Sequence, residues 1–207
     1  MAFVLRLCLP LVLALLAGCG SMRLVDNDVS SFARWQAAQT AVTGAPGSTY
    51  RFERLPSQER LPPLGHELGQ DQLEAAAQQA LERRGLVFKP EAALLTVQVG
   101  MTSVVQPGGY GSGLYGGPGV ALGTGTGGSF IGLSFPVMRM EPPVYLRELS
   151  LVVRDSRNNA VVYETRARHS GPWGDARAIW PAMLEAALDG FPNPPAGMRR
   201  VKVEIPR

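Results

Sequence analysis

Few residues of this chain have types and spacings that indicate catalysis. His66 and His169 are its two histidines, and neither stands in a metal-binding motif such as HExxH, so each is expected to be a solvated or hydrogen-bonded surface residue. Ser112 and Ser129 lie among glycines, but neither occupies the serine position of the G-x-S-x-G nucleophile elbow. The sequence therefore predicts no catalytic residue and no metal ligand.

The glycines of Gly123-x-Gly125-x-x-Gly128 match the dinucleotide-binding fingerprint in form only. In that fingerprint a helix N-terminus follows and holds the pyrophosphate, whereas residues 130–135 (FIGLSF) are typical of a strand. The phosphate-binding sequence GxxxxGK[ST] does not occur in the chain. We therefore expect no nucleotide and no cofactor.

The acidic residues are predicted at turns, helix caps and solvent-exposed faces, where capping and solubility explain them. Two of them could still converge in three dimensions, which leaves open a periplasmic hydrolase or transferase with an unrecognised carboxylate site. The tryptophans are expected in the core or at its rim, with a carbohydrate-stacking surface as the alternative. These residues are Glu59, Glu67, Asp71, Glu74, Asp155, Glu164 and Asp175 among the acids, and Trp35, Trp173 and Trp180.

Cys19 has the clearest chemical role. It follows Leu16-Ala17-Gly18 and about ten apolar residues preceded by Arg6, which is the layout of a secretory signal and too short for a membrane-spanning helix. The string resembles the lipobox of bacterial lipoprotein precursors. That resemblance implies cleavage between Gly18 and Cys19, a diacylglyceryl thioether on the Cys19 sulfur, and usually a third acyl chain on its amino group.

Two or three acyl chains hold a protein to a bilayer almost permanently, so we expect a membrane-bound protein. The residue after Cys19 is Gly20, and no Asp stands there as an inner-membrane retention signal. The expected location is the outer membrane, with the protein lipid-anchored and facing the periplasm; an ordinary secreted protein cut elsewhere is the alternative. The expected division is a signal peptide at 1–18, a lipidated tether at 19–27 and one domain at 28–206.

The charge of the chain argues against nucleic acid as a partner. Removal of residues 1–18 deletes Arg6 and leaves 19 basic and 17 acidic side chains, with the two signs interspersed. With Cys8 removed and Cys19 acylated, no thiol remains for a disulfide or a metal, although the compartment permits disulfides. Stability must therefore come from a hydrophobic core.

Hydrophobic periodicity predicts an α+β domain: a mostly antiparallel sheet of about five or six strands with two helices packed on one face. Strand-like and helix-like segments follow the order β-β-α-β, a Gly-rich insertion, and β-β-α-β. The expected strands are 28–35, 48–55, 94–101, 147–154, 160–168 and 200–205, and the expected helices are 71–84 and 175–189.

Local signals mark the ends of several elements. Asp71 with Glu74 resembles a capping box, and Gly85 suits the left-handed residue that follows a helix. Residues 155–159 (DSRNN) predict a turn between two strands, because Asp and Asn tolerate positive φ. Pro181 predicts that the second helix is bent or begins late.

The insertion at 107–132 contains 12 glycines in 26 residues. One hypothesis is a mobile loop, because glycine loses the most backbone entropy on ordering. A second is a hairpin around Gly127-Gly128. A third is a close-packing face for a partner or the bilayer, built on the GxxxG spacings of two sets of glycines. These sets are Gly109, Gly113, Gly117 and Gly119, Gly123, Gly127.

The order of several short motifs resembles the bacterial lipoprotein family called domain of unknown function 4136. These motifs are ERRG at 82–85, LLTVQVG at 94–100, RDSRNNAVVYET at 154–165 and GFPNPP at 190–195. The resemblance covers most of 28–206 outside the insertion and implies a periplasm-facing α+β domain on a lipid anchor. The family supplies no established activity.

We therefore expect a non-enzymatic binding or structural module of the cell envelope, held to the membrane through Cys19. Its expected partner is an envelope protein or peptidoglycan, bound through a sheet edge or the Gly-rich insertion. The hydrolase or transferase is the alternative.

Overall fold

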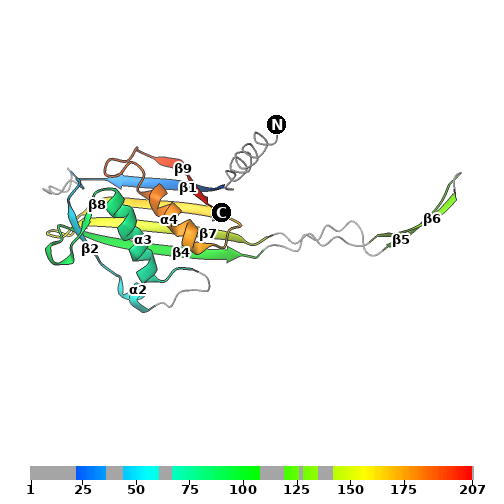
Figure 1. Cartoon of the computed structure of the whole chain (residues 1–207), viewed down its shortest axis with the longest axis horizontal. Coiled ribbons are helices and arrows are strands. Elements are labelled where there is room, and N and C mark those ends of the chain that lie inside the picture. Colours follow the sequence, from blue (N-terminus) through cyan, green and yellow to red (C-terminus); the bar gives the residue numbers. More distant parts are fainter. Residues whose placement is uncertain are drawn as a thin grey trace, which may run out of the picture.

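A computed structural model describes residues 22–35, 44–60, 67–107, 119–125, 128–134 and 142–206. Its main body is a large sheet with two helices, α3 (Gln70–Arg83) and α4 (Ala176–Ala187), lying on the same face (Figure 1). The short helices α2 (Pro56–Arg60) and η1 (Pro90–Ala92) complete the helical elements of the described residues. The expected α+β class, with two helices on one face, is confirmed.

The sheet has seven strands and is mixed, so the expectation of five or six mostly antiparallel strands is wrong in both respects. β2 pairs in parallel with β3 and β4, and the other neighbours are antiparallel. The parallel pairs arise because α3 returns the chain to the end of the sheet where β2 began. In spatial order the strands are β3 (Val87–Phe88), β2 (Thr49–Phe52), β4 (Leu95–Gln106), β7 (Val144–Asp155), β8 (Val161–Gly171), β1 (Met22–Ala33) and β9 (Met198–Pro206).

The core lies between this sheet and the two long helices. Alternate strand residues point toward the helices, for example Val97 and Val99 of β4 and Leu149, Leu151 and Val153 of β7, and all of these are buried. Each helix packs an apolar stripe against these strand residues, as its 3.6-residue periodicity predicts. The buried helix residues include Leu73, Ala77, Ala80 and Leu81 of α3 and Ile179, Trp180, Met183, Leu184 and Ala187 of α4.

β1 begins six residues earlier than expected. It starts at Met22, which is paired with Pro206 of β9, and the pairing continues along both strands to Ser30 and Met198. Residues 22–27, expected in the free tether, are therefore part of the sheet.

The N-terminus of α3 differs from the expected capping box. Gly69 is the N-cap residue, and its backbone N–H donates to the Gln72 side chain at 3.3 Å. The expected pair has another role: Asp71 and Glu74 both accept hydrogen bonds from Arg54. These two carboxylates therefore form ion pairs with Arg54 and do not cap the helix.

The second helix begins at Ala176, with Pro181 inside it, so a late start is wrong. Asp175 caps the first turn by accepting a hydrogen bond from the Ala178 N–H at 3.3 Å. Pro181 removes one backbone donor from the helix. Burial of neighbouring apolar residues, including Ile179 and Trp180, compensates for that loss.

Part of the Gly-rich insertion forms a separate two-stranded ribbon. β5 (Gly119–Gly125) pairs antiparallel with β6 (Gly128–Ser134), and Val120 lies opposite Leu133 in the register. This agrees with the hairpin hypothesis, but Gly128 already belongs to β6 and lies opposite Gly125, so Gly127-Gly128 is not the turn that was expected. Figure 1 shows the ribbon beyond the end of the seven-stranded sheet. Gly109, Gly113 and Gly117 lie outside the described residues.

The turn between β7 and β8 is as predicted, with Asn159 at φ 58°. The end of α3 also agrees, since Gly85 has φ +88° and the N–H groups of Gly85 and Leu86 donate to Glu82 O and Leu81 O. This pair of bonds is a Schellman motif, which requires a left-handed residue.

We expect Gly85→Ala to lower the free energy of unfolding by about 2 kcal/mol and Gly197→Ala by about 1 kcal/mol. Both glycines have φ +88°, but a Cβ at Gly85 would lie 3.0 Å from Pro46 Cβ, whereas nothing lies within 4 Å at Gly197. Urea denaturation measures both losses. Equal losses would show that the Pro46 contact has no effect.

Candidate functional site

Among the ion pairs of the described residues, the one between Arg147 and Glu67 has both side chains largely removed from solvent. Arg147 of β7 has a fully buried side chain, and Glu67, in the segment before α3, is 12% exposed. The Arg147 Nε donates to both carboxylate oxygens of Glu67, at 3.1 and 3.4 Å. Nη2 lies 2.9 Å from Glu67 Oε1 but lacks hydrogen-bond geometry.

Other donors converge on the same carboxylate. Trp180 of α4 donates its Nε1–H to Glu67 Oε2 at 2.6 Å, and Ser103 of β4 donates to Oε1 at 2.8 Å. Arg147 also donates from Nη1 to the Trp173 carbonyl oxygen at 2.8 Å, and its guanidinium lies 4.8 Å from the Tyr145 ring centroid. We call Glu67, Arg147, Trp180 and Ser103 the Glu67 cluster; it joins β4, β7 and α4 to the segment before α3.

The electrostatics of the Glu67 cluster favour an ionised carboxylate. Burial alone would raise the pKa of the Glu67 carboxyl, but hydrogen bonds from Arg147, Trp180 and Ser103 together outweigh burial and hold that pKa below its usual range. A carboxylate with a lowered pKa and occupied oxygens is a poor general acid or base near neutral pH.

An open pocket of about 460 Å³ adjoins the cluster. Two carboxylates, Glu67 and Asp175, line it, which is the convergence that the enzyme alternative requires. Both carboxylates already accept hydrogen bonds: Glu67 accepts them within the Glu67 cluster, and Asp175 accepts one as the cap of α4. The other lining residues are Leu68, Gln72, Gly174, Ala176 and Arg177. Within the described part of the chain, no three His, Cys, Asp or Glu residues are grouped so that they could hold a metal ion.

The sequence predictions for individual residues have mixed outcomes. Gly18, Cys19, His66 and Ser112 lie outside the described residues. The expectation of a surface histidine is wrong for His169, which is buried and donates from Nδ1 to the Asp26 carbonyl oxygen at 2.8 Å. The glycines at 123, 125 and 128 lie in the β5–β6 ribbon, and no helix follows them there.

For Asp155 the predicted turn position is correct, but solubility does not explain the residue. It lies at the predicted turn but is fully buried. Hydrogen bonds from Arg157 outweigh burial and lower the pKa of its carboxyl. Of the other acidic residues, Glu164 forms an ion pair with Arg166, and Glu59 is exposed in α2.

The tryptophans lie in or beside the core, as expected. Trp180 and Trp35 are buried, and Trp35 packs against Tyr163 and Phe191. Trp173 is partly buried, and its ring lies 4.7 Å from the Arg23 guanidinium. The buried positions leave no exposed stacking surface on Trp35 or Trp180.

Sequence reasoning missed the Glu67–Arg147 pair, although one signal was present. Arg147 has the same parity along β7 as the buried residues Leu149, Leu151 and Val153, so a charge stood at an inward-facing position. Such a residue requires a buried partner. Nothing local to the sequence identifies Glu67 as that partner.

The chain matches one protein-family model and is distantly similar to several solved structures. The family model described as "Domain of unknown function (DUF4136)" matches residues 36–193. No curated protein matches the sequence. None of the described helices has the length and hydropathy needed to span a bilayer.

Two solved structures illustrate the distant similarity. A PDZ domain protein from Parabacteroides distasonis ATCC 8503 is 12% identical with a TM-score of 0.49, and the alignment covers 88% of this chain but 39% of that chain. The PelC dodecamer from Paraburkholderia phytofirmans is 14% identical with a TM-score of 0.39, and the alignment covers 82% of this chain and 99% of that chain.

We expect Glu67→Gln to lower the free energy of unfolding by about 3 kcal/mol at pH 7, because it leaves the buried Arg147 charge without a counter-ion. Glu148→Gln is the matched control. It removes an exposed pair with Arg168 and should change stability by at most about 1 kcal/mol.

The same variant should change the acid dependence of stability. Because the pKa of Glu67 is lower in the folded state than the usual 4.5, its stabilising contribution is present above about pH 4.5 and is lost as the pH falls through the folded value. Urea unfolding between pH 7 and pH 3 measures this loss, which should be smaller in Glu67→Gln than in the unmodified protein. Parallel curves for the two proteins would contradict it.

Proposed function

The chain belongs to the DUF4136 family, and from this premise and the structure we propose that it is a non-enzymatic binding or structural module of the bacterial cell envelope. In this proposal Cys19 carries lipid, the outer membrane holds the anchor, and the domain faces the periplasm. An envelope protein or peptidoglycan is the proposed partner.

The non-enzymatic part of the proposal depends on the hydrogen bonding and the lowered pKa of the Glu67 carboxylate. It lines the pocket, but three side chains donate to its carboxylate and its pKa is lowered. General acid or base catalysis requires a group that exchanges protons near the working pH. This arrangement supports a role for Glu67 in holding the elements together.

The proposed anchor lies close to the folded domain. Only Gly20 and Ser21 separate Cys19 from Met22, the first residue of β1. Three extended residues span at most about 11 Å. A lipidated Cys19 would thus hold the start of β1 near the membrane, and a partner would have to come within reach of that surface.

Two features could receive the partner. β9 is the outer strand of the sheet beside β1, so one of its edges is unpaired within the sheet. The β5–β6 ribbon lies between β4 and β7 in the sequence, but it forms a separate sheet and pairs with neither strand. The ribbon is the better candidate, because β9 carries Arg200 and Lys202, and charged residues on an edge strand oppose pairing with further strands.

One observation favours the second candidate, a hydrolase or transferase: Glu67 and Asp175 line the same pocket. That candidate requires turnover of a cell-wall fragment by the purified protein, abolished by Asp175→Asn with the fold intact. Measuring such turnover alongside partner binding separates the two functions.

Cys19→Ser should release the protein from membranes and prevent lipid attachment, because the thioether needs the cysteine sulfur. Membrane flotation and mass spectrometry of the mature N-terminus measure the two effects. A protein that starts at an unmodified Cys19, or Cys19→Ser protein that still floats with membranes, would overturn the proposed anchor.

Replacement of residues 107–143 by a two-residue Asn-Gly turn should abolish partner binding and leave the sheet folded. Gln106 and Val144 are paired across β4 and β7, so a tight turn can connect them. Crosslinking and purification of the lipidated protein should recover one stoichiometric envelope partner, which is lost with the ribbon. Glu148→Gln serves as the control that keeps the ribbon; recovery of the same partner by the ribbonless protein would exclude the ribbon as its binding surface.

A further inference from the structure

One end of the large sheet gathers the start of β1 and the ends of several neighbours. Met22 of β1 pairs with Pro206 of β9, Gly171 of β8 pairs with Tyr145 of β7, and β7 begins opposite the end of β4. Figure 1 shows the chain's C-terminus and the direction of the β5–β6 ribbon at this end. We call it the N-terminal end of the sheet, because the first residue of β1 lies there.

Exposed apolar side chains lie at both ends of the sheet: Phe32 and Met198 lie at the far end, and four others lie at the N-terminal end. Met22 is 55% exposed and Val104 is 52% exposed, and Leu24 and Val105 are also exposed. In the register, Val104 of β4 lies opposite Leu146 of β7, within two residues of the end of each strand. Apolar side chains that are grouped on a folded surface mark contact sites more often than single exposed ones do.

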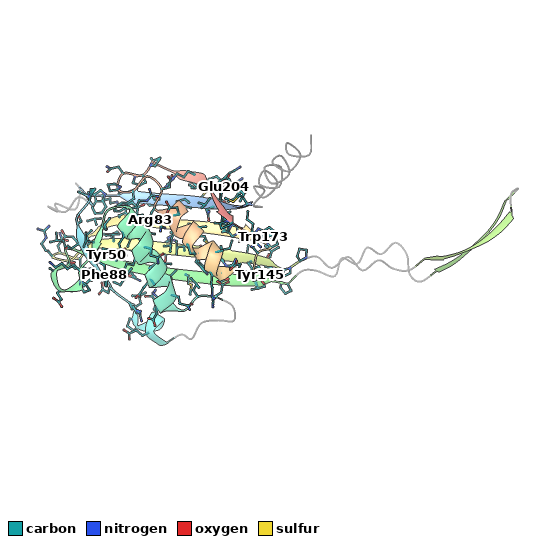
Figure 2. All side chains as sticks on the ribbon, in the orientation of Figure 1. Tyr50, Arg83, Phe88, Tyr145, Trp173 and Glu204 are labelled. Atoms are coloured by element: carbon teal, nitrogen blue, oxygen red, sulfur yellow. The ribbon has the colours of Figure 1, made fainter. Side chains whose placement is uncertain are left out.

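Aromatic rings lie at the same end. Figure 2 shows Tyr145 and Trp173 there. Trp173 is only partly buried, and the Arg23 guanidinium lies 4.7 Å from its ring centroid. Trp and Tyr, with nearby basic side chains, are the residues that favour the interface between lipid headgroups and acyl chains.

Ion pairs on the helix-free face begin farther along the strands. Glu148 pairs with Arg168, and Asp28 pairs with Arg200. Both pairs lie at least three residues inside their strands from the N-terminal end. Glu204 lies nearer that end, opposite Leu24, and is exposed, which suits a headgroup layer but not the acyl core.

We propose that the N-terminal end of the sheet rests on the lipid bilayer, with Met22, Leu24, Val104 and Val105 in the membrane interface. The inference rests on the proposed lipid anchor, since a lipidated Cys19 lies at most about 11 Å from Met22. That distance is too short for the domain to move far from the surface. Of the two ends of the sheet, only the N-terminal end lies within reach of the proposed anchor, so the bilayer is the occupant proposed for it.

The proposal fixes the orientation of the domain. The strands stand away from the membrane, and Phe32, ten residues along β1 from Met22, lies about 33 Å farther out. The ribbon-bearing segment leaves β4 at Gln106 and returns at Val144, so it starts and ends at the membrane surface.

Lipid-borne quenching tests the orientation. Leu24→Cys and Val104→Cys, each in the lipidated protein, are labelled with an environment-sensitive fluorophore and reconstituted into vesicles of phosphatidylethanolamine and phosphatidylglycerol with a fraction of nitroxide-labelled lipid. Lipidation occupies the Cys19 sulfur, so the introduced thiol takes the label. Phe32→Cys is the matched control, because Phe32 is 57% exposed on the same strand as Leu24.

The expected result is quenching several-fold stronger at positions 24 and 104 than at position 32, with blue-shifted emission at the first two. Vesicle flotation of each labelled protein is measured in the same samples, and circular dichroism confirms the fold. Flotation with equal or absent quenching at the three positions would overturn the orientation and leave the anchor intact. Failure of the lipidation-competent protein to float would overturn the anchor, and the orientation with it.

Discussion

Burial of one face of the sheet under α3 and α4 is the interaction on which the rest of this structure depends. In the mature form expected from the sequence, no free thiol is left for a disulfide, so apolar packing must supply most of the stability. Alternate residues of the long strands and eight of the twelve residues of α4 are buried in this layer. The opposite face is then free to carry ion pairs, and the ends of the strands become the places where apolar side chains remain exposed.

The Glu67 cluster adds direction to this packing. Apolar contacts are non-directional, so they allow helices to shift over a sheet, whereas the hydrogen bonds from Arg147, Trp180 and Ser103 require defined positions for three elements. A buried ion pair need not raise stability relative to apolar residues of the same shape, but loss of one partner is destabilising. The cluster therefore accounts for a charged arginine at an inward position of β7 without a catalytic role.

The sequence predicts those parts of the structure that are encoded locally. The α3 stripe, the left-handed Gly85 and the Asn159 turn depend on neighbouring residues, and the structure confirms them. The parallel pairing of β2 was not predictable in this way, because it depends on where α3 returns the chain. The partner of Arg147 was hidden for the same reason: 80 residues separate it from Glu67, and only the three-dimensional fold brings them together. His169 has the same parity along β8 as the buried Thr165 and Ala167, which indicates an inward position, but nothing local identifies the Asp26 carbonyl oxygen as its partner.

The early start of β1 shortens the segment between Cys19 and the folded domain, and this limits how far the domain could move from a lipid anchor on Cys19. A tether of nine residues would let the domain move about 30 Å from a lipid anchor, and an interface between domain and bilayer would then be one arrangement among many. In the proposed arrangement only two residues lie between the anchor and β1, so the register of β1 would set the height of each of its side chains above the membrane. Pairing of Met22 with Pro206 prevents the first residues of β1 from serving as extra tether unless β1–β9 hydrogen bonds break. A lipid anchor on Cys19 would therefore be coupled to sheet formation through residues 22–27, which the sequence assigns to the tether and the structure places in β1.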